Sequence, residues 1–221
     1  MLDAVFFARP VDAVAKDLVG KVLRRRVGPR WLSAAIVETE AYGTDRGSHA
    51  WLGRTPSREA MWAPPGTVYM YFSRGADSFN ISAKGDGCAV LIKAARPFVD
   101  ATSGHDALEV MHRLNPGRSK PRPDHRLLAG QTLLTRALDL RVREWNGRPF
   151  ERDRFFVDDV GYRPESIVRC RRVGIPPGRD EHLMLRYVDE AHARSATRNP
   201  LRTRAWIEGQ DYQRLPPGAP P

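Results

Sequence analysis

Apolar and polar residues alternate along much of the first hundred residues, and this period of two predicts β-strands. The alternation predicts strands at 21–27, 31–41, 67–72, 78–83 and 88–95. Gly28 and Pro29 join the first two strands as a hairpin, and the glycines of a KGDG segment make a tight turn between the last two. Paired strands therefore dominate this part of the chain.

A period of three to four residues predicts helices elsewhere. Helices are expected over 10–19, 55–62, 104–114 and 127–140. After residue 150 the pattern returns to short strands, in the segments RFFV, SIVRCRRVG and LMLRYV. The pattern predicts an α/β fold of the α+β type, with a single domain over residues 1–214 and a Pro-rich disordered tail over 215–221.

Size and composition narrow the class of protein. A chain of 221 residues is long enough to bury a substantial core as one domain. Because no apolar run reaches the roughly 18 residues of a membrane span, and the first residues do not resemble a secretory signal, we expect a cytoplasmic or nucleoid-associated protein. Cys88 and Cys170 lack CxxC spacing, so they indicate neither a zinc site nor a disulfide framework, and we expect buried, reduced thiols.

Basic residues outnumber acidic ones. Lys plus Arg number 36 against 26 for Asp plus Glu, which gives a net charge of +10. Such a surplus favours a polyanionic partner such as nucleic acid. The alternative is an arginine-rich composition without a binding role, as a GC-rich genome would produce. Charge alone does not separate these explanations.

The segment WLSAAIVETEAY, residues 31–42, carries an unusual polar pattern. In an extended strand, Glu38 and Glu40 lie about 7 Å apart on one face. Ile36 shares this face, and Val37 lies on the other. Two carboxylates beside apolar side chains are unfavourable in a core unless they are hydrogen-bonded or act on a ligand. The alternative is a strand end whose glutamates emerge into solvent.

Several motifs in this region occur in a familiar order. They are IVETEAY, SHA, RTPSREAMW, GTVYMYF, NIS and GDGCAVLIKA. In this order they resemble the alkyladenine DNA glycosylase family, also called the 3-methyladenine or methylpurine DNA glycosylases. The resemblance extends from about Phe6 to Tyr187 and is densest between Ile36 and Pro97. The ordered series is far more specific than any one of its motifs.

The resemblance implies a monofunctional DNA glycosylase, a hydrolase that initiates base excision repair. Its expected substrates in duplex DNA are alkylated or deaminated purines: 3-methyladenine, 7-methylguanine, hypoxanthine and ethenoadenine. Such an enzyme flips the damaged purine into a pocket and hydrolyses its N-glycosidic bond with an activated water. The resemblance implies no cofactor, no metal and no Schiff base; no lysine is evident in a position to attack the sugar, so strand cleavage is not expected. We expect a monomer built on a curved, mostly antiparallel sheet flanked by helices.

Glu40 matches the family's catalytic glutamate, which activates the water and stabilises positive charge on the sugar. Glu38, one strand repeat earlier, is poorly spaced to act on the same atom, and we interpret it as structural.

Four further residues match the family's base-binding pocket. Tyr42, His49 and Tyr71 match the aromatic side chains that sandwich the flipped base, and tyrosine faces also attract the positive charge of an alkylated purine. Asn80 matches the asparagine that opposes the exocyclic amine of guanine, which excludes normal guanine. Taken singly, His49 would be interpreted as a loop-capping histidine, and the tyrosine face as half-buried packing.

The sequence departs from the family pattern at three places. Arg74 stands where the family commonly places a tyrosine that wedges into the gap left by the flipped nucleotide. Lys93 stands at a basic position near the backbone of the scissile nucleotide, where the family has an arginine. Lysine keeps the positive charge but lacks the planar guanidinium that binds two oxygens at once. We expect Arg74 and Lys93 to bind DNA. Gln131 and Leu133 replace a proline and a lysine, so a phosphate contact there is missing or moved.

Two other functions fit the same residues. One is a non-catalytic binder of damaged or bent DNA that has kept the pocket and lost turnover; the intact Glu40 argues against it. The other is an RNA-directed or nucleoside hydrolase with the same pocket, which the basic composition leaves open.

Overall fold

A long strand, β2 (Arg30–Tyr42), lies at the centre of the fold. β5 (Ala89–Pro97) pairs with one side of it. The other side is shared, because β1 (Val22–Val27) pairs with the first half of β2 and β8 (Arg186–Asp189) with the second half. The computed structural model describes residues 1–73 and 75–221.

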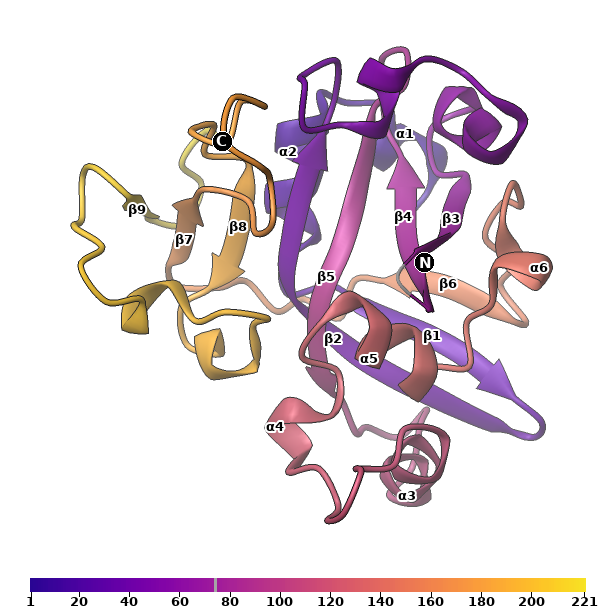
Figure 1. Cartoon of the computed structure of the whole chain (residues 1–221). Helices are drawn as coiled ribbons and strands as arrows, with labels where there is room; N and C mark the ends of the chain where they lie inside the picture. The colour runs from indigo at the N-terminus through magenta and orange to yellow at the C-terminus, as the bar shows by residue number, and fades with distance from the viewer. Residues whose placement is uncertain (74) are drawn as a thin grey trace.

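The remaining strands extend this sheet in both directions. Next to β5 lie β4 (Ala76–Ser82) and then β3 (Val68–Ser73). Next to β8 lie β7 (Ile167–Cys170) and then β9 (Tyr212–Leu215). β6 (Phe155–Asp158) pairs with β1. The pairings between these strands are antiparallel, and the sheet is open and curved (Figure 1). The chain is thus a single α+β domain with a mostly antiparallel sheet, as the sequence predicts.

Short helices flank the sheet. They are α1 (Ala4–Phe7), α2 (Val11–Leu18), α3 (Asp106–Leu114), α4 (Asp124–Leu127), α5 (Gln131–Ala137) and α6 (Val142–Trp145), with 3-10 helices η1 (His49–Leu52), η2 (Pro56–Trp62), η3 (Ala193–Ser195) and η4 (Pro200–Arg202). The predicted helix over 127–140 is wrong as one element, because Gly130 has a φ of 132° and separates α4 from α5. None of the helices among the described residues has the length and apolar character needed to cross a membrane.

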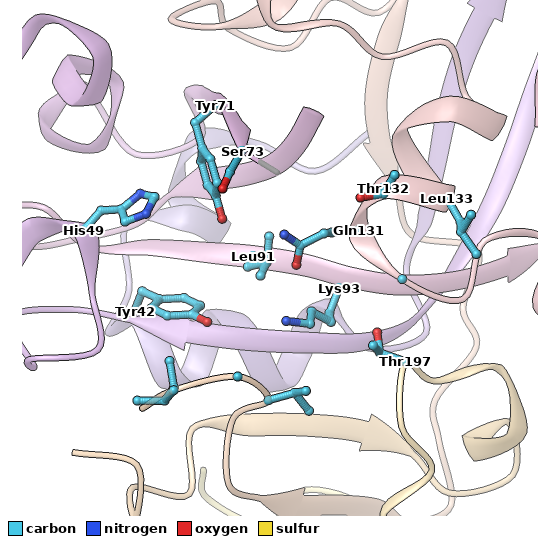
Figure 2. Close-up of a pocket in the computed structure, with 14 residues that line it drawn as sticks. Tyr42, His49, Tyr71, Ser73, Leu91, Lys93, Gln131, Thr132, Leu133 and Thr197 are labelled. Carbon is cyan, nitrogen blue, oxygen red and sulfur yellow. The ribbon is translucent and has the colours of Figure 1, made fainter. Parts of the chain in front are cut away.

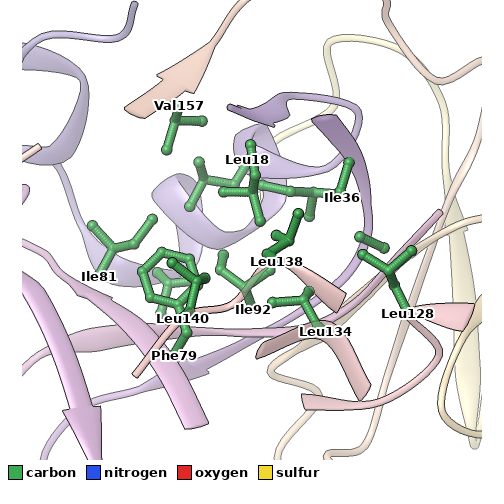
Figure 3. Close-up of a cluster of buried hydrophobic side chains, with 14 of the residues drawn as sticks. Leu18, Ile36, Phe79, Ile81, Ile92, Leu128, Leu134, Leu138, Leu140 and Val157 are labelled. Atoms are coloured by element: carbon green, nitrogen blue, oxygen red, sulfur yellow. The ribbon is translucent and has the colours of Figure 1, made fainter. Parts of the chain in front are cut away.

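The main core lies between the sheet and helices α2, α3 and α5. Val14, Ala15 and Leu18 of α2 are fully buried, which confirms the predicted apolar stripe of this helix. They meet side chains from the sheet and from α5, among them Ile92 and Leu134 (Figure 3). Burial of each large aliphatic side chain contributes roughly 1.5–3 kcal/mol.

A β-bulge in β2 changes which residues face the core. The register against β5 shifts between Ile36 and Glu38 and again between Glu38 and Thr39. As a result Ile36 packs in the main core, whereas Val37 packs in a separate small cluster on the C-terminal strands. The prediction that Ile36 shares a face with Glu38 and Glu40 is therefore wrong, because an inserted residue reverses the alternation at that point.

The Pro-rich tail follows β9, which ends at Leu215. Lys16 of α2 donates a hydrogen bond through Nζ to the carbonyl oxygen of Ala219. A cavity of about 510 Å³ lies between the first tail residues and the helix. Disorder of residues 215–221 and the boundary at residue 214 stay predictions.

Candidate active site

Glu40 is fully buried on the second half of β2, and three donors bind its carboxylate. Oε1 accepts a hydrogen bond from the backbone N–H of Val173 at 2.8 Å. Oε2 accepts one from the Tyr42 hydroxyl at 2.7 Å and one from Lys93 Nζ at 3.3 Å. The donors come from three different segments, so the fold has to assemble before the carboxylate is satisfied.

The surroundings of Glu40 favour its charged form. Burial alone would raise the pKa of this carboxyl, but the charge of Lys93, the N–H of Val173 and the charge of Arg186 together lower the pKa below its ordinary value. Burial and the neighbouring carboxylate raise the pKa of Tyr42 well above its ordinary value. Tyr42 therefore keeps its proton at neutral pH, and its hydroxyl donates a hydrogen bond to the Glu40 carboxylate.

A cavity of about 470 Å³ opens above this carboxylate. Tyr42 and Lys93, which both bind Glu40 Oε2, are part of its wall (Figure 2). Glu40 itself is fully buried and is not among the residues that line the cavity. The other lining residues come from six segments and are His49, Tyr71, Ser73, Leu91, Gly130, Gln131, Thr132, Leu133, Val173, Gly174, Ile175 and Thr197. The structure thus brings the predicted acid next to an aromatic-walled cavity.

His49 and Tyr71 of β3 line one side of the cavity, and Tyr69 of the same strand contacts His49. The centroids of the His49 and Tyr71 rings are 4.6 Å apart at 66°, and His49 Nδ1 lies 2.9 Å from the Tyr69 hydroxyl. Burial, with a smaller effect of the Arg58 charge, lowers the pKa of His49, and burial raises the pKa of Tyr71. Both side chains are therefore neutral at pH 7.

A smaller hollow of about 90 Å³ continues between the aromatic rings. Asn80 of β4 lies there and is 4% exposed. Its Nδ2 donates to the carbonyl oxygen of Tyr69 at 3.1 Å, which fixes the amide in the wall of the hollow. Asn80 thus joins Tyr42, His49 and Tyr71 at one place, although it follows them on a separate strand.

Lys93, which the sequence analysis expects to bind DNA, lies in the wall of the cavity. Its side chain is 10% exposed and its Nζ forms an ion pair with Glu40. The expectation that no lysine attacks the sugar stays a prediction, although Lys93 lines the cavity. What the structure adds is that this ammonium group is already paired with the carboxylate.

Glu38 binds a different set of partners, although it lies on the same strand. Its Oε1 accepts from Arg186 Nε at 2.6 Å, and its Oε2 accepts from the backbone N–H of Thr197 at 2.6 Å. Both charged side chains of the pair are fully buried. This pairing supports the interpretation of Glu38 as structural.

Two residues near Glu40 carry little signal in the sequence. Val173 and Arg172 follow β7, far along the chain from Glu40, and only the basic run RCRRVG marks their segment. Gln131 extends into the cavity and donates through Nε2 to Ser78 Oγ at 2.9 Å (Figure 2). Arg74, predicted to bind DNA, lies outside the described residues.

The described part of the chain offers no group of three or more His, Cys, Asp or Glu side chains arranged to hold a metal ion. Cys88 and Cys170 are free; Cys170 is buried, whereas Cys88 is partly exposed, which corrects the expectation of two buried thiols. Burial raises the pKa of Cys170 to about 11, so this thiol is protonated.

Comparison with known proteins identifies the family of this chain. The model of the family "Methylpurine-DNA glycosylase (MPG)" matches residues 5–193. A relative from Pseudomonas savastanoi pv. phaseolicola, named "Putative 3-methyladenine DNA glycosylase", is 53% identical over 215 residues, which cover 96% of each chain. Relatives with the same name from Pseudomonas aeruginosa and Carboxydothermus hydrogenoformans are 51% and 35% identical, covering 97% and 81% of this chain and 90% and 91% of their own. The chain therefore belongs to the methylpurine-DNA glycosylase family and is a DNA glycosylase, a hydrolase that acts on N-glycosyl bonds.

Proposed function

We propose that this DNA glycosylase flips alkylated or deaminated purines out of duplex DNA and hydrolyses their N-glycosidic bond with a water that Glu40 activates. The proposed substrates are 3-methyladenine, 7-methylguanine, hypoxanthine and ethenoadenine. The observation that carries the proposal is the buried carboxylate of Glu40, bound by three donors, next to an aromatic-walled cavity of about 470 Å³. Cavities of roughly 300–1,000 Å³ are typical of small-molecule sites. The enzyme is proposed to work as a monomer in the cytoplasm or on the nucleoid.

The aromatic side chains suit a flipped purine. Tyr42 lies on one side of the cavity, with His49 and Tyr71 on the other (Figure 2). A planar base inserted between them stacks on both sides and leaves little room for water. The tyrosine faces attract a cationic alkylated purine by roughly 0.5–2 kcal/mol, whereas a neutral lesion gains stacking alone.

Asn80 is proposed to reject normal guanine. Its amide is held by the Tyr69 carbonyl in the wall of the small hollow, so it cannot move aside without breaking a buried hydrogen bond. An exocyclic amine that points at this wall would collide with it and lose its own hydrogen bonds to water. Purines without that amine avoid both costs.

Glu40 is proposed to act mainly through its charge. Departure of the base leaves positive charge on the sugar, and a fixed anion in a dry site stabilises that charge strongly. A carboxylate has about four acceptor positions, of which Val173, Tyr42 and Lys93 occupy three, so one remains to orient a water. Because its pKa is lowered, Glu40 is a weak base, and electrostatic stabilisation outweighs proton abstraction.

Lys93 is proposed to bind the DNA backbone, together with Arg74. A phosphate near the cavity would draw Lys93 Nζ away from Glu40 Oε2 and expose that oxygen to the water. Lys93 is not proposed as a nucleophile, since attack on the sugar requires a neutral amine and Nζ is paired with a carboxylate. Borohydride treatment during the reaction should therefore trap no covalent protein–DNA product.

The test uses purified protein and duplex oligonucleotides that each carry one of the four lesions. Base release is detected as strand breaks after alkali, with an undamaged duplex as control. Wild type should cleave at least one lesion strand, and Glu40→Gln should lose at least 100-fold in single-turnover rate while it still binds the same duplex. Equal cleavage by both proteins would remove Glu40 from the mechanism, and no cleavage of any lesion would contradict the proposed substrates.

A further inference from the structure

Arg172 is a buried cation next to the site, and its side chain contacts the end of β2, the strand that carries Glu40 and Tyr42. Its guanidinium lies 4.5 Å from the centroid of the Tyr42 ring. Nη1 donates to the carbonyl oxygen of Ala41 at 3.1 Å, and the two terminal nitrogens bind the two oxygens of Asp45 at 3.2 and 2.5 Å. The side chain of Arg172 is 0% exposed, so these contacts are shielded from solvent.

Asp45 completes the arrangement. Its carboxylate also accepts from the backbone N–H groups of Gly43 and Gly47, at 3.3 and 2.9 Å, and so organises the loop after β2. A Cβ on Gly47 would lie 2.9 Å from Arg172 Nη2, which shows how closely the loop packs on the guanidinium. Arg172 and Asp45 thus join the end of β2 to the loop after β7.

Two neighbours of the Arg172 guanidinium and backbone, Tyr42 and Val173, are the residues that donate to the two oxygens of Glu40. Val173, the next residue, donates its N–H to Oε1, and Tyr42, whose ring covers the guanidinium, donates its hydroxyl to Oε2. We propose that Arg172, held by Asp45, is a positioning residue that fixes both of these donors and thereby holds the Glu40 carboxylate in place for the reaction.

The remaining charges around Glu40 come from other elements. Lys93 faces it from β5, and Arg186, which is paired with Glu38, from β8; Cys170 of β7 and Tyr71 of β3 are neutral neighbours. None of these side chains contacts Arg172 through a hydrogen bond or ion pair in the described part of the chain. Loss of the Arg172 contacts therefore removes two donors and leaves the cations Lys93 and Arg186 in place.

The inference rests on the proposed role of Glu40, but its first test does not require activity. The Glu40 carboxyl is followed by ¹³C NMR through a pH titration of wild type, Asp45→Asn and Arg172→Lys. Asparagine cannot form an ion pair with the guanidinium and offers it a single acceptor oxygen. Lysine keeps the positive charge but cannot make the two-oxygen contact of a guanidinium. Both variants should raise the Glu40 midpoint by about one pH unit, because hydrogen bonds to the charged form are weakened. A midpoint equal to that of wild type in Asp45→Asn would overturn the proposal.

Asp100→Asn is the matched control. Asp100 forms the same two-oxygen pair with the buried Arg24, at 2.8 and 2.7 Å, and neither residue lines the cavity. This variant should leave the Glu40 midpoint where it is in wild type; an equal shift would show a general loss of stability and would overturn the positioning role.

Excision rates provide the second readout. On a lesion that wild type removes, the pH below which the single-turnover rate falls should be higher in Asp45→Asn, by the same amount as the Glu40 midpoint. A uniform loss of rate at every pH would contradict positioning. Failure of wild type on every lesion would count against the proposed substrates alone, because the NMR midpoints test the positioning role separately.

Discussion

Lys93 is the cation paired with Glu40, and its removal should make the excision rate depend more strongly on pH. Lys93 lowers the pKa of Glu40, so Lys93→Met should raise it and increase the protonated, inactive fraction as the pH falls. We expect excision by Lys93→Met to fall at least 10-fold further relative to wild type at pH 5 than at pH 8. Lys93→Arg retains the charge and should restore the wild-type pH profile in single-turnover assays. An unchanged profile in Lys93→Met would argue against this coupling.

His49 should distinguish cationic from neutral lesions at acidic pH. Burial lowers its pKa below the ordinary value of 6.5, so the ring is neutral at pH 7 and gains a proton only below that value. A protonated ring repels a cationic base such as 7-methylguanine more than hypoxanthine. The ratio of their excision rates should therefore fall several-fold as the pH is lowered through the His49 pKa.

The control for this effect is His49→Gln, which cannot titrate. Its ratio of 7-methylguanine to hypoxanthine excision should stay flat between pH 7.5 and 5, whatever the absolute rates. A wild-type ratio that is equally flat would show that the charge of His49 does not act on the base.

The residues of the site were predictable where their chemistry is local. Glu40 and Tyr42 stand two positions apart on one strand, and alternation alone brings Tyr69 and Tyr71 to one face. Arg172 was not predictable, because its contacts join segments about 130 residues apart and nothing in the local sequence sets their register.

At the level of elements, one β-bulge and one glycine decide where the site residues lie. The bulge of β2 separates Ile36 from Glu38, and Gly130 ends the run of α4 so that α5 begins at the cavity with Gln131. Hydrophobic periodicity predicted strands β1 to β5 and helices α2 and α3, since it reports burial. It cannot report an inserted residue or a backbone turn, because neither changes the apolar composition of the segment.

Gly130 should be unusually sensitive to substitution. Its φ of 132° and ψ of 145° belong to a region that is nearly restricted to glycine, whereas Gly28 in the β1–β2 turn has a φ of 58° that other residues adopt at lower cost. Neither site is crowded: the nearest atom to a Cβ at Gly130 is 3.9 Å away, and none lies within 4 Å at Gly28.

The two alanine variants therefore compare backbone strain alone. Gly130→Ala should lower the free energy of unfolding by about 2–3 kcal/mol, and Gly28→Ala by about 1 kcal/mol. Urea denaturation followed by circular dichroism measures both values. Equal losses would mean that the backbone at residue 130 relaxes without cost.

Across the whole molecule, the site combines residues from the N-terminal and the C-terminal strands of one sheet. The motifs between residues 36 and 97 supply Glu40, the aromatic rings, Asn80 and Lys93, and this is the part that the sequence identified. The C-terminal strands β7 and β8 bring the loop around Val173 and the Arg186–Glu38 pair against β2. Their role depends on a long-range strand pairing, which the short apolar runs of that region do not specify.

The net charge of +10 also belongs to the whole molecule, and salt distinguishes its two explanations. If lysines and arginines contact phosphates, binding to duplex DNA releases counterions, and the logarithm of the association constant falls linearly with the logarithm of salt concentration. Three to six contacts give a slope of roughly −3 to −5. The slope should be similar for lesion-bearing and undamaged duplexes, because phosphates are common to both, while the lesion changes only the intercept. Fluorescence anisotropy between 50 and 300 mM salt measures both lines, and a slope near zero would assign the arginine content to composition without a role in binding.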